Sequence, residues 1–488
     1  MKKQVISAAV LSLILLSSCG EAASQSDTNA VTLQDVVSAA SGDITEPVKN
    51  EYPGKIEDYG GYTFTFLNQA DDFWTGAHHI LDYSEITGDS VNDAIYTRNR
   101  TAEKDLNIVI NVNKQELADV YTMMSKSVAA GEDVYDAVYK PMNWGKTSFG
   151  DKEVMNLKGI PTLLFGEKWW NNEFIDQATI GDNILYTTID YCNLMGYCYA
   201  NVLSFNKSMM ENLGLAAPYD LVRSGNWTYD EMLSYMKQAV NIGTDDSFKI
   251  SLNGTCTYGF AFQHEEGPTA MLQGCGDYLI VKDENNNPVL RDDLTRIVNA
   301  SEKLTDMLSP EGNAVMYNTA DLSGLVVFLQ GRAMFYHTSL GAAHSEKFRS
   351  AEFEYGLLPM PKLDPQQKQY ATNISQYTFA LNIPVTASDP ERTGNVIDYI
   401  SYLSYNDVIP VLQEALCYKG MRDDDSIEMM NLMLETETID FGVCAGLTYD
   451  FLSKIANNEL KGKKEFMSTF EKNSKAIQKN IDKLFSEG

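Results

Sequence analysis

Two tryptophans stand beside side chains that form strong hydrogen bonds, and each group directly follows a predicted strand. The first group is Asp71, Asp72 and Trp74, and the second is Asn143 with Trp144. An indole face packs well on the C–H face of a sugar ring, whereas carboxylate and amide groups bind hydroxyls. The combination predicts a site for a polyhydroxylated ligand. The alternative is that both rings only pack within loops.

The elements that would position these groups alternate along the chain. Strands are predicted at 62–67, 108–112 and 134–139, and helices at 90–106 and 116–130. This β-α-β-α-β order is typical of a parallel sheet with right-handed crossovers. Ligands of such sheets bind beyond the carboxyl ends of the strands, which is where both tryptophan groups fall.

The N-terminus has the plan of a secretory signal peptide. A basic start at 1–3 precedes an apolar run at 5–16, which is short for a membrane span. The run closes on Leu-Ser-Ser-Cys at 16–19, which resembles a lipobox. The resemblance implies that 1–19 is a lipoprotein signal and that the thiol of Cys19 is acylated. The alternative is an uncleaved anchor.

Residues 20–54 are poor in aromatic residues and rich in Ala, Ser, Asp and Thr. This composition predicts a flexible tether. Together with the lipid on Cys19, it would hold a folded body at the cell membrane, facing the extracellular or periplasmic side.

Length and charge narrow the class of protein. A chain of 488 residues predicts two to three domains. The formal net charge of -29 makes nucleic acid an improbable partner, because such a surface repels phosphates. The 27 tyrosines suit a cleft that needs apolar rings with polar tips.

The cysteines show no metal-binding spacing. There is no C-x-x-C pair and no histidine at ligand distance, so neither a metal nor another cofactor is predicted. Cys192 and Cys198 could form a disulfide in an oxidising compartment or could be buried thiols.

No catalytic motif stands out either. The chain lacks the G-x-S-x-G, H-E-x-x-H and phosphate-loop patterns. His264, Glu265 and Glu266 are consecutive, so their side chains diverge on any regular element. A solvated loop is predicted there.

One stretch has a distinctive order of local signals. A strand predicted at 194–205 leads to a short helix that starts at 206, and Gly214 stands where a left-handed cap would end it. Thr228 and Glu231 have capping-box spacing for the next helix. The order F-N-K, G-L, P, W-T, D-E resembles the most recognisable segment of bacterial extracellular solute-binding proteins of family 1, the capture lipoproteins of sugar-type ABC importers.

Two later segments are similar to the same family. They are the Gly-Arg-Ala-Met-Phe step at 331–335 and the Tyr-Gly-Leu-Leu-Pro-Met-Pro-Lys segment at 355–362. The resemblance implies an α/β, two-lobe, periplasmic-binding-protein-like (type 2) fold with discontinuous lobes and a hinge. It gives 55–192 with 352–402 as the first lobe, and 193–351 with 403–488 as the second.

The resemblance also implies where a ligand would bind. Tyr191 and Asn193 would lie where the chain crosses between the lobes, Tyr336 and His337 just past the 331–335 step, and Tyr377 beside the last strand of the first lobe. It implies a non-enzymatic monomer that captures a saccharide, expected to be an oligosaccharide, by hinge closure and delivers it to ABC permease subunits.

Other functions fit the same residues. The solute could be a peptide, a polyol or a phosphoester. A surface-anchored polysaccharide hydrolase would need two carboxylates close together in the cleft, and 67 acidic residues offer many pairs. A sensor lipoprotein on the same fold is a further alternative.

Overall fold

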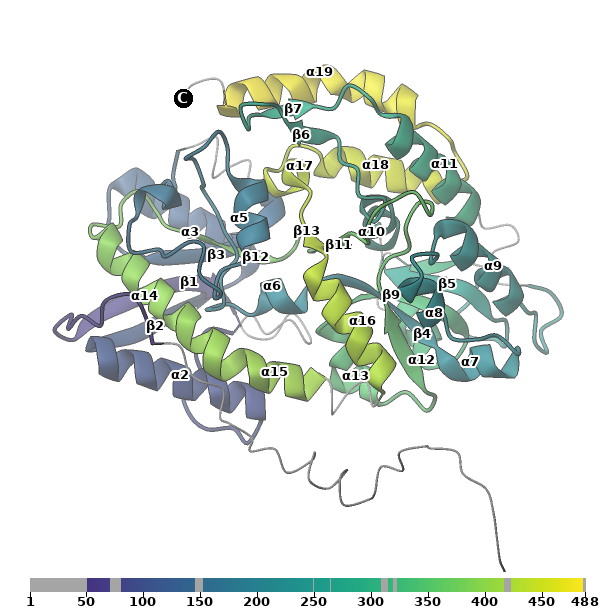
Figure 1. Ribbon diagram of the computed structural model, residues 1–488, viewed down its shortest axis with the longest axis horizontal. Coiled ribbons are helices and arrows are strands. Elements are labelled where there is room, and N and C mark those ends of the chain that lie inside the picture. Colours follow the sequence, from purple (N-terminus) through teal and green to yellow (C-terminus); the bar gives the residue numbers. More distant parts are fainter. Residues whose placement is uncertain are drawn as a thin grey trace, which may run out of the picture. The chain divides into compact units, whose positions relative to one another are not determined.

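Two separate β-sheets form the framework of the molecule in the computed structural model (Figure 1). The structure describes residues 51–70, 80–144, 152–248, 250–263, 265–308, 315–318, 323–416 and 423–485. Both sheets belong to the unit formed by residues 52–488. The predicted signal peptide, Cys19 and the tether up to residue 50 lie outside the described residues.

The first sheet has four strands in the order β12-β3-β1-β2. Strands β1, β2 and β3 are parallel to one another where they pair, and β12 runs antiparallel to β3. The predicted β-α-β-α-β order is therefore confirmed. The elements are β1 (Tyr62–Gln69), α2 (Ser90–Leu106), β2 (Ile108–Gln115), α3 (Leu117–Ala130), β3 (Ala137–Pro141) and β12 (Phe379–Asn382).

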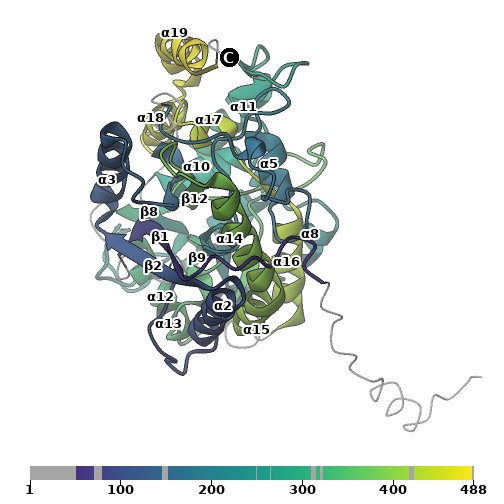
Figure 2. The same ribbon diagram turned by 90° about the vertical axis from the view of Figure 1, so that its left-hand side faces the viewer.

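Helices α2 and α14 (Pro390–Leu403) pack against each other beside this sheet (Figure 2). Helix α14 is buried from Thr393 to Leu403. It begins with Pro390 after Asp389, whose side chain accepts a hydrogen bond from the Arg392 N–H. A proline in the first helical turn sacrifices no helical hydrogen bond. The cap and the proline thus fix where α14 starts.

The second sheet has five strands in the order β10-β4-β9-β5-β8. Its strands are β4 (Asn201–Asn206), β5 (Tyr258–Gln263), β8 (Val315–Asn318), β9 (Ala333–Ser339) and β10 (Tyr355–Leu358). Strand β5 is parallel to β8 and β9, whereas β4 is antiparallel to β9 and β10. Helices α9 (Tyr229–Ala239) and α12 (Ser323–Leu329) pack on it.

The local signals around β4 form as predicted. Gly214 has φ +70°, the left-handed conformation that glycine adopts without strain. The Thr228 side chain accepts a hydrogen bond from the Glu231 N–H and caps α9. Gly331 turns the chain from α12 into β9 with φ +73°.

Two predictions for the segments between the sheets are wrong. The strand expected from 194 begins only at Asn201, because Met195–Cys198 form the short helix α6. The chain does not return to the first sheet at 352, because β10 pairs with β4 through four residues. The return strand is β12.

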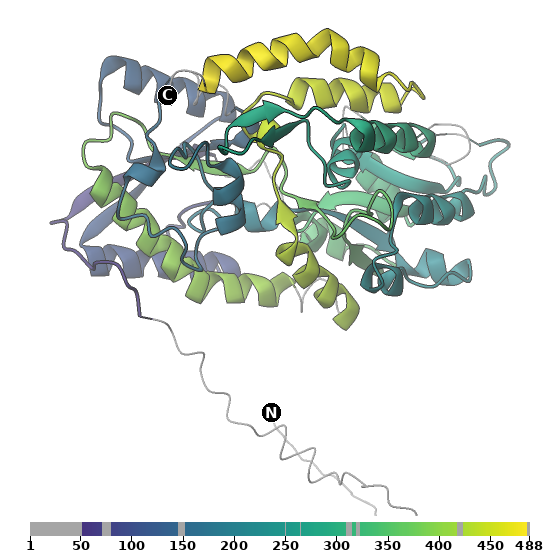
Figure 3. The same ribbon diagram turned by 45° about the horizontal axis from the view of Figure 1, so that its top comes forward.

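The C-terminal helices pack on helices from the middle of the chain. Helix α18 (Tyr449–Glu459) packs on α10 (Glu266–Gln273) and α11 (Thr295–Leu308), and α19 (Phe466–Phe485) packs on α18 and α11 (Figure 3). The apolar residues Phe466, Ile477 and Ile481 on α19 are buried. This long amphipathic helix therefore closes a core instead of presenting a free apolar face.

The end of the predicted tether is part of the folded body. Tyr52 packs its ring against Tyr399 and Tyr402, with centroids 4.9 and 5.1 Å away. Its hydroxyl donates to the Asp398 carboxylate at 3.0 Å, and the Trp170 indole N–H donates to the same carboxylate at 2.8 Å. The tether prediction is therefore wrong for its last residues.

Candidate functional site

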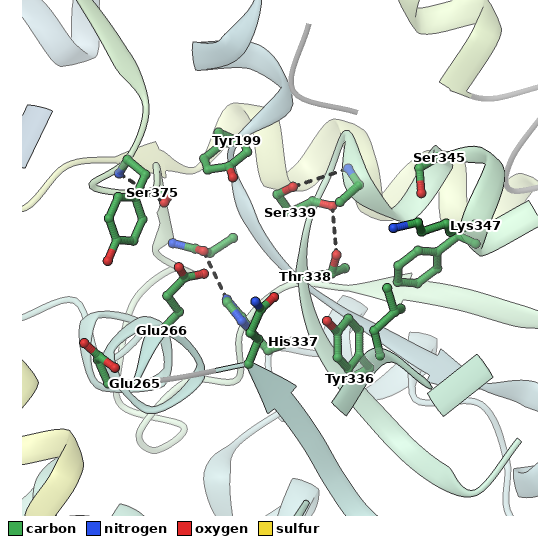
Figure 4. Close-up of a pocket in the computed structure, with 16 residues that line it drawn as sticks. Tyr199, Glu265, Glu266, Tyr336, His337, Thr338, Ser339, Ser345, Lys347 and Ser375 are labelled. Carbon is green, nitrogen blue, oxygen red and sulfur yellow. Dashed lines mark hydrogen bonds between the residues drawn. The ribbon is translucent and has the colours of Figure 1, made fainter. Parts of the chain in front are cut away.

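A cavity of about 460 Å³ lies at the ends of β4, β5 and β9 and beside the segment that leads into β12 (Figure 4). The strands of the second sheet and the segments next to them supply most of its lining side chains. The segment that leads into the first sheet supplies Ser375 and Tyr377. The lining residues are Tyr199, Asn201, Gln263, Glu265, Glu266, Leu325, Tyr336, His337, Thr338, Ser339, Ala342, Ser345, Lys347, Phe348, Ser375 and Tyr377.

Tyr336 is the most deeply buried of the tyrosines that line the cavity. It is only 4% exposed and stacks on Phe328, with ring centroids 5.5 Å apart and planes at 26°. Among the described residues its hydroxyl has no hydrogen-bond partner. A buried ring with a free polar tip is suited to bind a ligand hydroxyl.

Tyr377 is fixed at both ends. The carbonyl of the next residue, Thr378, accepts a hydrogen bond from the Met142 N–H at 3.0 Å, which ties this segment to the first sheet. The Tyr377 hydroxyl lies 2.8 Å from that of Tyr449 at the start of α18. The ring is thus positioned before any ligand arrives.

His337 and Asn201 form a buried polar pair on adjacent strands. The His337 Nε2 lies 3.1 Å from the Asn201 side-chain oxygen, and both residues are less than a tenth exposed. Burial lowers the pKa of His337 to about 4. The ring is therefore neutral at pH 7, and Nε2–H must donate because the amide oxygen only accepts. Nδ1 is left as an acceptor.

Glu265 and Glu266 bring negative charge to the cavity. The Ser453 hydroxyl donates to Glu265 Oε1 at 3.2 Å. Burial, and secondarily the charge of Glu265, raise the pKa of Glu266 to about 7. The solvated loop predicted for these residues is wrong, because Glu266 begins α10 directly beside the lining strands.

Of the residues predicted to bind ligand, the structure brings Tyr336 and Tyr377 together in this cavity. Asn143 does not line the cavity, but its N–H donates to the carbonyl of Gln376 at 3.1 Å, and Gln376 stands between the lining residues Ser375 and Tyr377. Asp71, Asp72 and Trp74 lie outside the described residues, as does the side chain of Trp144.

Tyr191 and Asn193 do not line the cavity. The Asn193 side-chain oxygen accepts from the Met195 N–H at 2.9 Å and starts α6, and Tyr191 stacks on Tyr405 with centroids 6.2 Å apart. The buried Arg98 donates to the Cys192 carbonyl at 3.0 Å. The crossing between the lobes is therefore a packed core. Tyr191 and Asn193 lie in this core and not in the ligand cavity where the sequence predicted them.

Several lining residues were not singled out from the sequence. Tyr199 and Asn201 follow the unexpected helix α6, so their position could not be read from a strand pattern. Gln263 ends β5, and Glu265 and Glu266, which the sequence assigned to a solvated loop, follow at its carboxyl end. The rule used for the tryptophan groups, applied to this strand, would have found them.

None of the five cysteines in the described residues lines the cavity. Cys192 and Cys198 are buried free cysteines, so the disulfide alternative is wrong and the buried-thiol alternative holds. In the described part of the chain no cluster of His, Cys, Asp and Glu could hold a metal ion. No helix there is both long and apolar enough to cross a lipid bilayer.

Two mixed sheets with a cavity beside the segments that join them define the fold of the type 2 periplasmic binding proteins, of which the maltose-binding proteins are examples. Solved structures that are similar to most of this chain include substrate-binding proteins of ABC transporters in complex with sugars. No protein-family model matches the sequence, and no curated protein matches it either.

Three solved structures illustrate the similarity. A cyclo/maltodextrin-binding protein in complex with maltotetraose has a TM-score of 0.57 at 13% identity, covering 86% of this chain and 97% of its own. The galacto-N-biose/lacto-N-biose I-binding protein of Bifidobacterium longum, in complex with lacto-N-biose, has 0.55 at 12%, covering 87% and 98%. UgpB of Mycobacterium tuberculosis, in complex with glycerophosphocholine, has 0.54 at 12%, covering 87% and 98%. The first two are described as binding proteins, and all three hold a small-molecule ligand.

Proposed function

We propose that this chain is the extracellular substrate-binding lipoprotein of an ABC importer and that it captures a carbohydrate, an oligosaccharide by preference, without transforming it. The observation that carries the proposal is the cavity, in which Tyr336 and Tyr377 stand among amide, hydroxyl and carboxylate groups. Aromatic faces with hydroxyl-binding groups around them are what a saccharide requires. The volume of about 460 Å³ is within the ordinary range of small-molecule sites.

The two sheets suggest how capture works. The cavity takes side chains from the second sheet and from the segment entering the first, so a bound ligand would touch both lobes. We now assign β10 to the second lobe, because it pairs with β4. The other lobe boundaries are those proposed from the sequence. Shifting a 1:99 population to 99:1 needs about 5.5 kcal/mol, and a micromolar site supplies about 8.2 kcal/mol. Closure around a ligand of ordinary affinity is therefore feasible, and the closed form would be recognised by the permease.

The similar structures support a saccharide and also show the main competitor. Two of the three bind oligosaccharides and the third binds a phosphodiester, glycerophosphocholine. The cavity favours the saccharide, because its carboxylates outnumber its cationic side chains and a phosphate would be repelled. Lipid anchoring through Cys19 and a monomeric state are part of the proposal.

A thermal-shift screen of the purified full-length protein tests the function. Mono- and oligosaccharides, polyols, short peptides and glycerophosphodiesters would each be added, and a ligand at 100 times its Kd should add about 2.7 kcal/mol of stability. A saccharide that stabilises the protein and is recovered intact supports the proposal. Stabilisation by peptides or phosphodiesters alone would contradict the ligand class, and consumption of the sugar would show a hydrolase.

The lipid anchor has its own test. Cys19→Ala should move the protein from the membrane fraction to the soluble fraction, because one thiol carries the lipid. Cys256→Ala, a buried thiol in the body of the protein, is the matched control and should stay with the membrane. Membrane retention of Cys19→Ala would contradict lipid anchoring.

A further inference from the structure

The charges of the cavity are separated in space. Glu265 and Glu266 lie on one side of Tyr336 and His337, and Lys347 lies on the other (Figure 4). Lys347 is exposed and is the one Lys or Arg among the described lining residues. Because His337 is neutral, no cationic side chain among the described lining residues balances the carboxylates at their end of the cavity.

Glu266 in particular lacks a partner. It is partly buried, and within the described part of the chain its carboxylate has no hydrogen bond. Removing a carboxylate from water without a donor or a counter-charge is costly. In a binding site this cost is offset when the ligand supplies the missing group.

Tyrosine rings surround this carboxylate. The charge of Glu266 contributes to the raised pKa values of Tyr199, Tyr336 and Tyr377, so all three rings are near it. Tyr336 also points an unpartnered hydroxyl from a ring that is 4% exposed. Ring faces attract cations and a carboxylate pairs with them, so rings and carboxylate together favour a ligand with positive charge.

The whole molecule acts in the same direction. A formal net charge of -29 concentrates cations near the surface and repels anions. A neutral saccharide gains nothing from this field, whereas a protonated amine is steered towards the protein. The long-range and local electrostatics thus favour the same kind of ligand.

We propose that the cavity takes a saccharide that carries a protonated amine, with the ammonium group against Glu266 and among Tyr199, Tyr336 and Tyr377. The proposal rests on the proposed function, which it deepens by naming an amino sugar. The uncharged part of the ligand then extends past His337 and Asn201, whose free imidazole nitrogen and amide bind hydroxyls.

Titration calorimetry with matched sugars tests the proposal on the full-length protein at pH 7, where Glu266, with a pKa of about 7, is about half ionised. The probes are mono- and disaccharides of glucosamine and galactosamine with free amines, their N-acetylated forms, and glucose and galactose analogues with a hydroxyl instead. We expect a free-amine sugar to bind at least tenfold more tightly than its N-acetylated and hydroxyl counterparts.

Variants locate the effect. Glu266→Gln should remove the tenfold preference, and Glu266→Asp should retain part of it. Glu284→Gln, an exposed carboxylate in the turn between β6 (Ile280–Lys282) and β7 (Pro288–Leu290), is the matched control and should keep all of it.

The outcomes separate the two proposals. Neutral sugars that bind as tightly as amines would overturn the amino-sugar ligand and leave the carbohydrate-binding function standing. A preference for amines that survives in Glu266→Gln would overturn the assignment to this carboxylate. If no saccharide of the panel binds, both proposals fail.

Discussion

The hydroxyl oxygens of Tyr377 and Tyr449 lie 2.8 Å apart and form a hydrogen bond between the segment that leads into the first sheet and helix α18. Tyr377 stands in the segment that enters the first sheet, and Tyr449 begins α18, which packs on α10 and α11 beside the second sheet. This hydrogen bond is therefore a direct link between elements that a hinge motion would separate.

Removing that link should weaken ligand binding. Tyr449→Phe leaves every lining residue in place but deletes a hydrogen bond with a net worth of about 1 kcal/mol. We expect a three- to tenfold higher Kd by calorimetry. Tyr235→Phe, which deletes the local bond from α9 to the Ala216 carbonyl, is the control and should not change the Kd. Equal affinity of Tyr449→Phe and wild type would contradict a role for the link.

Two variants of Tyr336 should distinguish the contribution of its hydroxyl to ligand binding from the contribution of its ring to stability. Tyr336→Phe should weaken ligand binding about tenfold with unchanged stability, because the hydroxyl has no partner among the described residues. Tyr336→Ala should lower the free energy of unfolding by about 3–5 kcal/mol, because it empties the stack on Phe328. Calorimetry and urea unfolding provide the two measurements. Loss of stability in Tyr336→Phe would show a structural role instead.

Glu266 should make the free protein less stable as the pH rises. Its pKa is about 7 in the folded protein and 4.5 when unperturbed, so the folded state binds the proton more tightly. Stability is therefore lost between pH 4.5 and about 7, and the penalty is complete above pH 7. Among the described residues, the titratable groups that face it are Glu265, Tyr199, Tyr336, Tyr377 and Tyr449, and none of these is cationic.

Glu266→Gln should thus stabilise the ligand-free protein at pH 8 and have little effect at pH 4.5. Urea unfolding of variant and wild type at several pH values gives the difference directly. Comparison with wild type is needed because the partly buried Glu437 and the buried Glu459, with pKa values of about 8, add a similar background. A variant that is less stable than wild type at pH 8 would be the contrary result.

His337 should remain uncharged across the physiological range. Its pKa of about 4 follows from burial, so its ring signals should not shift between pH 5 and 8 in an NMR titration. The His337→Gln variant identifies the signal by its loss. A midpoint near 6.5 would mean that the imidazole is open to water.

Tyr52 should contribute to the stability of the folded body although the composition of its surroundings predicts a tether. Tyr52→Ala removes a hydrogen bond to the buried Asp398 carboxylate and the ring contacts to Tyr399 and Tyr402. We expect a loss of about 2–3 kcal/mol in urea unfolding. Ile56→Ala, at an exposed position nearby in the chain, is the control and should cost less than about 0.5 kcal/mol.

The sequence predicted the elements that depend on short-range signals. Alternating apolar residues located β1 and β2, and the capping signals at Gly214 and Thr228 marked real helix ends. The pairing of strands was harder to predict from the sequence, because β10 pairs with β4, about 150 residues away in the chain. Local pattern contains no information about such a partner.

The site shows the same division. Tyr336 was predicted because the 331–335 step fixes the start of β9, whereas Glu266 was assigned to a solvated loop. Its burial depends on rings from distant segments such as Tyr199 and Tyr377. Tyr191 was placed in the cleft, but Arg98 from α2 fills the crossing with hydrogen bonds to backbone carbonyls. Contacts between distant segments decided each of these outcomes.

The switch between sheets in the returning chain takes place within two residues. Ser375 donates its N–H to the Tyr199 carbonyl on the side of the second sheet, and the Gln376 carbonyl accepts from Asn143 on the side of the first. A change of backbone angle at this junction alters the spacing of Tyr336 and Tyr377 without replacing either ring. Selection for longer or shorter ligands can therefore act on the joint, so the chemistry of recognition and the size of what is recognised are free to evolve separately.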